Sequence, residues 1–97
     1  MPNVMIRYTI KRDQVARELE LLGAVYEELE STQQDGLRYA TFQLEDKVSF
    51  VELAVTDGPG RFSQLESFRH YRAGLDERCD EPPVMTELHE VGSFRFQ

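Results

Sequence analysis

Residues 48–79 read VSFVELAVTDGPGRFSQLESFRHYRAGLDERC and combine an extended run, a turn and a helix. The run Val48–Thr56 is rich in β-branched and other apolar residues, which is typical of a strand. The Gly-Pro-Gly sequence at positions 58–60 indicates a turn. Ser63 and Glu66 match the capping box that begins many helices, so we expect one helix over the rest of the stretch.

The apolar residues of this expected helix share one face that can cover a sheet. They recur at three- and four-residue steps or their sums, with Arg72 as an interruption: Leu65, Phe68, Leu75 and Cys79. His70 lies off this apolar face, so the pattern predicts a histidine outside the core.

Length, charge and cysteine content narrow the possible functions. A chain of 97 residues suits one domain, which we expect to span residues 1–97. The formal net charge of -7 at pH 7 opposes binding to nucleic-acid phosphates or an anionic membrane. With Cys79 as the single cysteine, we expect neither an intramolecular disulfide nor a zinc cluster. No leader-like start and no apolar run of roughly 20 residues is present, so we expect a cytoplasmic protein.

The first third of the chain predicts a strand followed by a helix. Val4–Lys11 alternates with the period of two that indicates a half-buried strand. Asp13 suits the N-cap of a helix running to about Ser31. The apolar stripe expected on this helix consists of Val15, Leu19, Leu22, Tyr26 and Leu29. The many glutamates mostly lie off this stripe, which is typical of a solvated acidic face.

Two further extended runs, Leu37–Leu44 and Val48–Thr56, are separated by three residues and predict an antiparallel hairpin. Pro82 and Pro83 stop the second helix and precede a last strand, Val84–Val91, with Gly92 as a candidate bulge. The element order is then β-α-β-β-α-β. This order predicts an α+β, ferredoxin-like sandwich with both helices on one face of the sheet.

Alternation assigns residues to the two faces of the expected sheet. The face under the helices should contain Val4, Ile6, Tyr8, Ile10, Ala40, Phe42, Leu44, Val51, Leu53, Val55, Val84 and Leu88. The open face should contain Met5, Arg7, Thr9, Tyr39, Thr41, Gln43, Phe50, Glu52, Ala54, Met85, Glu87, His89 and Val91.

The element order, the chain length and the stretch FVELAVTDGPGRFSQLESFRHYRAGL together resemble the antibiotic biosynthesis monooxygenase-like family of dimeric α/β barrels. Phe62 and His70 match an aromatic residue before the second helix and a histidine within it. The resemblance implies a homodimer paired sheet to sheet, with a small-molecule pocket in the barrel interior. It also implies a cofactor-independent monooxygenase. The haem-degrading branch is not implied, because the first strand reads VMIRYTIK and the chain has no tryptophan.

A cofactor-independent oxygenase needs a base and hydrogen-bond donors in a mostly apolar pocket. We expect His70 and His89 as catalytic residues, because histidine titrates near neutrality. The expected substrate-binding residues are Arg7, Tyr39, Thr41, Glu52, Phe62 and Glu87. Arg7, Tyr39 and Thr41 could donate to an oxyanion, and Glu52 or Glu87 could orient a histidine or act as a base if desolvated.

Each candidate residue also has a structural reading. An exposed helical histidine needs no special role, Arg7 with Glu52 or Glu87 could form an ion pair, and Phe62 could simply pack at the helix entrance. Cys79 suits a small core residue better than a nucleophile.

The resemblance therefore implies a cofactor-independent monooxygenase that acts on a small aromatic or quinol-type substrate, and we expect no cofactor and no metal. The alternative is a non-catalytic small-molecule-binding or interaction domain of the same fold, which needs the pocket without the base. An RNA-recognition module is disfavoured, because VSFVELAV lacks the basic and aromatic motif of such strands.

Overall fold

The computed structural model describes residues 3–58 and 60–96. Its elements are β1 (Asn3–Ile10), η1 (Arg12–Gln14), α1 (Val15–Thr32), β2 (Leu37–Gln43), β3 (Ser49–Thr56), η2 (Phe62–Gln64), α2 (Glu66–Ala73), α3 (Leu75–Arg78) and β4 (Cys79–Leu88). Within this described part of the chain, no helix is long and apolar enough to span a membrane.

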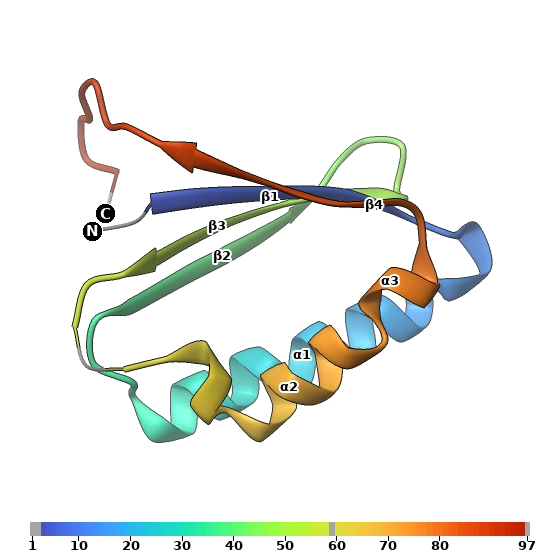
Figure 1. Cartoon of the computed structure of the whole chain (residues 1–97), viewed down its shortest axis with the longest axis horizontal. Coiled ribbons are helices and arrows are strands. Elements are labelled where there is room, and N and C mark those ends of the chain that lie inside the picture. The colour runs from blue at the N-terminus through green and yellow to red at the C-terminus, as the bar shows by residue number, and fades with distance from the viewer. Residues whose placement is uncertain (1–2, 59, 97) are drawn as a thin grey trace.

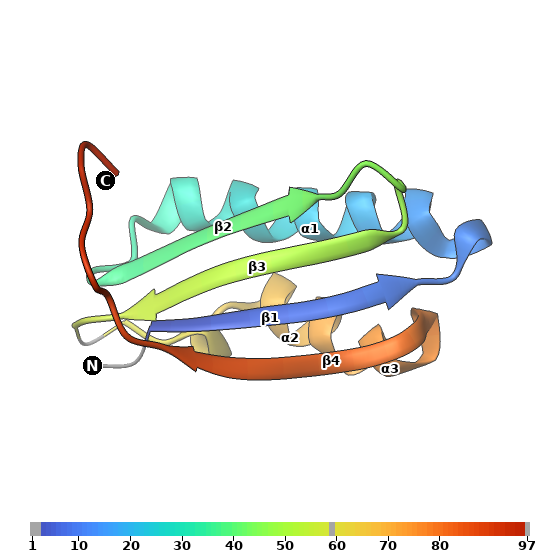
Figure 2. The ribbon, with the colours of Figure 1, turned by 90° about the horizontal axis from the view of Figure 1, so that it is seen from above.

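The strands form one antiparallel sheet in the order β2-β3-β1-β4, and the helices pack on one face of it (Figure 1). Seen from above, α1 lies toward the β2 edge, and α2 and α3 lie toward the β4 edge (Figure 2). In residues 3–58 and 60–96, no helix lies on the other face of the sheet (Figure 1). The predicted ferredoxin-like α+β sandwich is confirmed.

The strand register decides which side chains lie under the helices, because directly opposed residues of antiparallel strands point to the same side. Tyr8 of β1 opposes Phe50 of β3, and Ala54 of β3 opposes Tyr39 of β2. The helix-covered face therefore contains Tyr8, Ile10, Tyr39, Thr41, Phe50, Glu52 and Ala54. The prediction for β1 is confirmed, but those for β2 and β3 were wrong: their two faces are exchanged.

The exchange has a physical cause in the composition of β3. Val51, Leu53 and Val55 alternate with Phe50, Glu52 and Ala54, so both faces are largely apolar and the period of two does not choose between them. Because Glu52 is charged, its side of β3 was predicted to face solvent. The structure instead buries Glu52, with 3% of its surface exposed.

The last strand begins five residues earlier than expected, at Cys79, and contains both Pro82 and Pro83. Proline is tolerated here because β4 is an edge strand, where a missing N–H costs no ladder bond on the outer side. Val84 opposes Arg7 and Leu88 opposes Asn3, so these two residues lie on the open face and not under the helices as predicted. Met85 and Glu87 lie opposite Ile6 and Val4, on the helix side, contrary to their prediction. The strand ends before His89, Val91 and Gly92, which therefore have no place in the sheet.

Helix α1 buries only part of the predicted stripe: Leu22 is buried, and Val15 and Leu29 pack against the core. Its buried residues are Glu18, Leu21, Leu22 and Val25, whereas Leu19 is 46% exposed. The expected N-cap role of Asp13 was wrong: Asp13 lies within η1, and Gln14 precedes α1 without a side-chain cap.

The second predicted helix is divided into η2, α2 and α3, and the predicted capping box does not form. Leu65 stands at the N-cap of α2 in an extended conformation without a capping side chain. The Glu28 carboxylate on α1 instead accepts hydrogen bonds from the backbone N–H of Ser67 (3.0 Å) and from its hydroxyl (2.5 Å). One helix thus caps the other, and these bonds lower the pKa of Glu28.

The predicted Gly-Pro-Gly turn lies only in part within the described residues, since Pro59 falls outside them. Gly36, with a φ of 77°, packs against Gly58, and a Cβ at Gly36 would lie 2.4 Å from the Gly58 nitrogen. This close backbone approach fixes the start of β2 beside the end of β3.

The orientation of α1 is testable with a matched pair of leucines, both of which were predicted to lie on the buried stripe. Leu22 is 4% exposed and Leu19 is 46% exposed, so Leu22→Ala leaves a cavity in the core and Leu19→Ala does not. We expect Leu22→Ala to lower the free energy of unfolding by about 2–5 kcal/mol and Leu19→Ala by less than about 1 kcal/mol, measured by urea denaturation. Equal losses would contradict the helix orientation.

Candidate functional site

A buried carboxylate, Glu52, lies at the centre of the layer between the sheet and the helices. Its Oε2 accepts from the hydroxyl of Tyr71 at 2.6 Å and lies 2.7 Å from that of Tyr8. Its Oε1 accepts from the hydroxyl of Tyr39 at 2.6 Å. Three tyrosines from β1, β2 and α2 thus converge on one carboxylate of β3.

A second carboxylate, Glu18 of α1, joins this group through Tyr8. The Tyr8 hydroxyl lies 2.7 Å from Glu18 Oε2, and the other Glu18 oxygen accepts from Arg78 Nε at 2.9 Å. Arg78 also donates to the carbonyl of Tyr71 at 2.9 Å, and its guanidinium lies 5.6 Å from the centre of the Tyr71 ring. We call Tyr8, Glu18, Tyr39, Glu52, Tyr71 and Arg78 the carboxylate–tyrosine cluster.

Burial dominates the electrostatics of this cluster. It raises the pKa of Glu52, and the nearby charge of Glu18 acts in the same direction, while the three tyrosine hydrogen bonds act against them. Burial and the Glu52 charge also raise the pKa values of Tyr8, Tyr39 and Tyr71. The three tyrosine hydroxyls therefore remain protonated. Glu52 is the carboxyl group of the cluster whose pKa is raised, so it holds a proton more tightly than an exposed glutamate.

Aromatic rings surround the Tyr39 side of the cluster. Tyr39 stacks on Tyr26 with 5.3 Å between ring centres and meets the edge of Phe62 at 5.0 Å. Phe62 contacts Phe68 at 5.3 Å. The Tyr26 and Thr41 hydroxyls are hydrogen bonded at 2.7 Å, and burial raises the pKa of Tyr26 to about 12. We call the rings of Tyr26, Tyr39, Phe62 and Phe68 the aromatic wall. Such rings offer flat apolar surfaces to an aromatic ligand.

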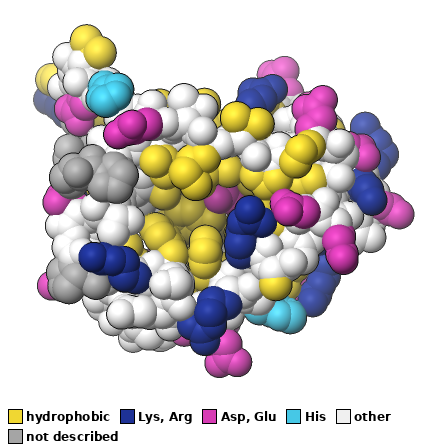
Figure 3. Space-filling view, viewed as in Figure 1, with side chains coloured by type: hydrophobic (Ala, Val, Ile, Leu, Met, Phe, Trp, Pro, Cys, Tyr) yellow, Lys and Arg dark blue, Asp and Glu magenta, His cyan; other side chains and the backbone are white. Residues whose placement is uncertain are grey.

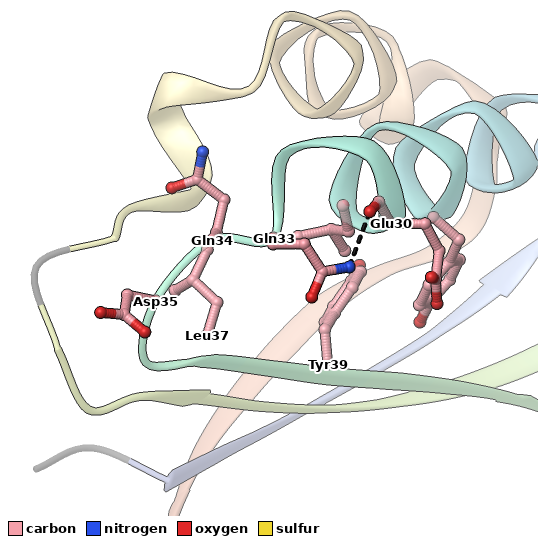
Figure 4. Close-up of a pocket in the computed structure, with 8 residues that line it drawn as sticks. Glu30, Gln33, Gln34, Asp35, Leu37 and Tyr39 are labelled. Carbon is pink, nitrogen blue, oxygen red and sulfur yellow. Dashed lines mark hydrogen bonds between the residues drawn. The ribbon is translucent and has the colours of Figure 1, made fainter.

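A pocket of about 310 Å³ opens beside this wall, lined by Tyr26, Leu29, Glu30, Gln33, Gln34, Asp35, Leu37 and Tyr39. Figure 4 shows Tyr39 rising from β2 toward the C-terminal turn of α1, where the Gln33 side chain donates to the Glu30 carbonyl at 2.7 Å. Tyr39 thus lines the pocket and also binds Glu52. It connects the protein surface with the buried carboxylate.

The space-filling view shows a further opening to this layer. Hydrophobic side chains gather in a recess between the sheet and the helices, and part of an acidic side chain is visible among them (Figure 3). Apolar side chains are therefore visible on the side on which β4 borders the sheet.

The structure brings together four of the predicted site residues: Tyr39, Thr41, Glu52 and Phe62. Tyr39, Thr41 and Glu52 lie under the helices and not on the open face as expected, and Phe62 joins them from η2, before the second helix as expected. Glu52 is desolvated, which is the condition under which we expected it to act as a base.

The other four predicted site residues lie elsewhere. Arg7 is exposed on the open face opposite Val84, and Glu87 is exposed on β4. His70 lines a groove of about 480 Å³ between α1 and α2 with Ala24, Glu28, Glu66 and Ser67, and His89 follows β4. Residues 3–58 and 60–96 contain no group of three His, Cys, Asp or Glu side chains placed to hold a metal ion.

Four cluster residues were not identified from the sequence: Tyr8, Glu18, Tyr71 and Arg78. Their spacing held a signal. Glu18 precedes the buried Leu22 by four residues, and Tyr71 and Arg78 each follow a residue of the predicted stripe, Phe68 or Leu75, by three. Polar residues at core spacing indicate a buried polar cluster only once the true stripe is known.

The raised pKa of Glu52 predicts a pH-dependent stability. Below its ordinary pKa of 4.5, folded and unfolded chains both hold the proton, and the favourable contribution is fully present. As the pH rises toward the native pKa, the unfolded chain releases the proton first and the contribution is lost. We expect wild-type stability to fall over this range relative to Glu52→Gln, measured by urea denaturation. Parallel pH profiles of the two proteins would contradict the raised pKa.

The sequence matches no protein-family model and none of the curated proteins. Several solved structures are nevertheless similar over nearly the whole chain. Rv0793 from Mycobacterium tuberculosis is 20% identical with a TM-score of 0.75, and the match covers 95% of this chain and 96% of that one. SnoaB, a cofactor-independent oxygenase from Streptomyces nogalater solved as a variant, is 16% identical with a TM-score of 0.70, covering 97% and 96%.

An antibiotic biosynthesis monooxygenase is 19% identical with a TM-score of 0.68, covering 95% of this chain and all of that one, 100%. Similarity at this level of identity is similarity of fold. The chain therefore has the ferredoxin-like α+β fold of the antibiotic biosynthesis monooxygenase proteins.

Proposed function

We propose that this protein oxidises a small phenol or quinol with molecular oxygen and without a bound cofactor. The observation that carries the proposal is the buried Glu52 carboxylate, which already meets the phenolic hydroxyls of Tyr8, Tyr39 and Tyr71. A carboxylate with phenol partners on both oxygens suits recognition of one more phenol. The likeness of the fold to SnoaB, a cofactor-independent oxygenase, supports the same reaction class.

The substrate ring would stack in the pocket beside Tyr26 and Tyr39, whose volume of about 310 Å³ suits a small aromatic molecule. Its hydroxyl would take the place of the Tyr39 hydroxyl at Glu52 Oε1. Phe62 would support the Tyr39 ring from behind, and Thr41 would hold Tyr26 in place through their hydrogen bond.

Glu52 acts as the general base in this proposal. A base works best when its pKa lies near the working pH, and burial moves the pKa of Glu52 in that direction. Glu52 takes the phenolic proton, and the electron-rich phenolate reacts with oxygen. One oxygen atom becomes a ring carbonyl and the other leaves as water. The phenolic proton and one ring hydrogen balance that water, and the substrate supplies the four electrons.

The open sheet face is proposed to pair with a second copy of the chain. Phe42 and Val84 are 49% and 61% exposed on this face, and Val51, Leu53 and Met5 share it by register. An apolar sheet face without a covering helix is a typical interface between subunits. The proposed pocket lies inside one subunit, so pairing would support the fold without completing the site.

The reaction is testable by oxygen consumption in aerobic solutions of simple phenols and hydroquinones. We expect Glu52→Gln to lower kcat/KM by about 100- to 10,000-fold, because it removes the base. His70→Ala and His89→Ala serve as controls and should retain the wild-type rate, since both lie away from Glu52.

Two outcomes of this experiment would contradict the proposal. Full activity of Glu52→Gln would exclude it as the base. Binding of phenols by calorimetry without any oxygen consumption would favour the non-catalytic binding domain.

The pairing is testable by light scattering coupled to size-exclusion chromatography. We expect a concentration-independent dimer for the wild type and a monomer for Phe42→Glu, because the substitution places a charge on the apolar open face. Leu19→Glu is the matched control, since Leu19 is equally exposed, at 46%, but lies on α1. A dimer that persists in Phe42→Glu and dissociates in Leu19→Glu would place the interface on the helices.

A further inference from the structure

The hydroxyl of Tyr8 lies between the two carboxylates of the cluster. Four oxygen–oxygen contacts join the Tyr8 hydroxyl and its neighbours. Tyr8 lies 2.7 Å from Glu18 Oε2, 2.7 Å from Glu52 Oε2 and 2.8 Å from the Tyr71 hydroxyl, and Tyr71 lies 2.6 Å from Glu52 Oε2. All four distances are those of O–H···O hydrogen bonds, and each such bond needs one proton between its oxygens.

The hydroxyls do not supply enough protons for these contacts. Tyr8 and Tyr71 carry one proton each, and ionised carboxylates only accept. With both glutamates ionised, at most two of the four contacts hold a proton, and the other two bring lone pairs together. One proton added to Glu52 Oε2 allows a third bond, and the bonds then run in one direction: Glu52 donates to Tyr8, and Tyr8 donates to Glu18.

Arg78 determines where the added proton stays. Its Nε donates to Glu18 Oε1 at 2.9 Å, so Glu18 has a buried cation as a direct partner. Glu52 has no cation among its hydrogen-bond partners, which are the three tyrosines. The proton therefore belongs on Glu52, and Glu18 receives the hydrogen bond that Tyr8 releases.

We propose that Tyr8 is a positioning residue whose hydroxyl turns from Glu52 to Glu18 when Glu52 takes up a proton. The cluster thereby stores one proton as a unit, with the Glu18–Arg78 pair as its fixed acceptor end. No heavy atom has to move, because both carboxylate oxygens already lie 2.7 Å from the Tyr8 hydroxyl. One O–H rotation replaces the Tyr8–Glu52 donor bond by a Tyr8–Glu18 donor bond.

Use of this unit in catalysis rests on the proposed function. A phenol bound at Glu52 Oε1 would give its proton to that oxygen, and a half-turn of the carboxyl group would bring the proton to the position of Oε2, where the turn of Tyr8 provides an acceptor. Proton storage itself needs no substrate, so the two proposals fail independently.

Among the described residues, no other group around the two carboxylates would supply this proton. The titratable and charged groups packed around the two carboxylates come from every neighbouring element: Tyr8 of β1, Tyr26 of α1, Tyr39 of β2, Tyr71 of α2, Arg78 of α3 and Cys79 of β4. Burial raises the pKa of Cys79 to about 11 and those of the tyrosines further still, so none of them releases a proton near neutral pH.

The test is a pH titration of the side-chain carboxyl carbons by NMR, on the full chain without substrate. We expect the midpoint of the Glu52 carbon to lie above the ordinary glutamate pKa of 4.5, because burial raises the pKa of Glu52. The Glu18 carbon should shift with the same midpoint, because it gains the Tyr8 hydrogen bond in the same step.

Two conservative variants identify the residue that links the carboxylates. Tyr8→Phe keeps the ring that stacks on Phe50 at 5.6 Å and removes the hydroxyl, so the shift of Glu18 at the Glu52 midpoint should disappear. Tyr39→Phe is the control. The Tyr39 hydroxyl contacts Glu52 Oε1 but not Glu18, so the common midpoint should persist when it is removed.

Separate midpoints for Glu18 and Glu52 in the wild type would overturn the proposal, and this result does not depend on any variant being folded. A common midpoint that survives in Tyr8→Phe would also overturn it, because the link would then not be the Tyr8 hydroxyl.

Discussion

The burial of one carboxylate shapes the interior of this small protein. Removing an ionised group from water is costly unless hydrogen bonds replace those of water. Glu52 is 3% exposed, and three tyrosine hydroxyls occupy both of its oxygens. Each tyrosine comes from a different element. The three hydroxyls therefore reach Glu52 only when β1, β2 and α2 are all correctly placed around β3.

The hydrogen bonds to Glu52 both stabilise the core and form the candidate site. The core includes Tyr8 and Tyr71 among its largest fully buried side chains, and both are partners of Glu52. Arg78 extends the cluster to α3 by neutralising Glu18. A substrate that displaced a tyrosine from Glu52 would therefore act directly on the packing of the domain. In a chain of 97 residues there is little room to separate a site from the core.

The two faces of the sheet have different chemistry. The polar cluster and its aromatic wall lie under the helices, where water is excluded and a carboxylate becomes a stronger base. The open face carries Phe42, Val51 and Val84 without any covering element. Chemistry inside one subunit and association on its outer face are thus separated by a single layer of strands.

The sequence by itself determined the order of elements, the ferredoxin-like architecture and four members of the candidate site, because periodicity, turns and proline positions are local signals. Tertiary structure decided which face each strand turns inward. Both faces of β3 are largely apolar, so only the pairing of Tyr8 with Phe50 places Glu52 under the helices. That pairing also explains why Glu18 and Arg78, which resemble ordinary surface charges in sequence, are buried together: each is stable there only because the other and Tyr8 are present.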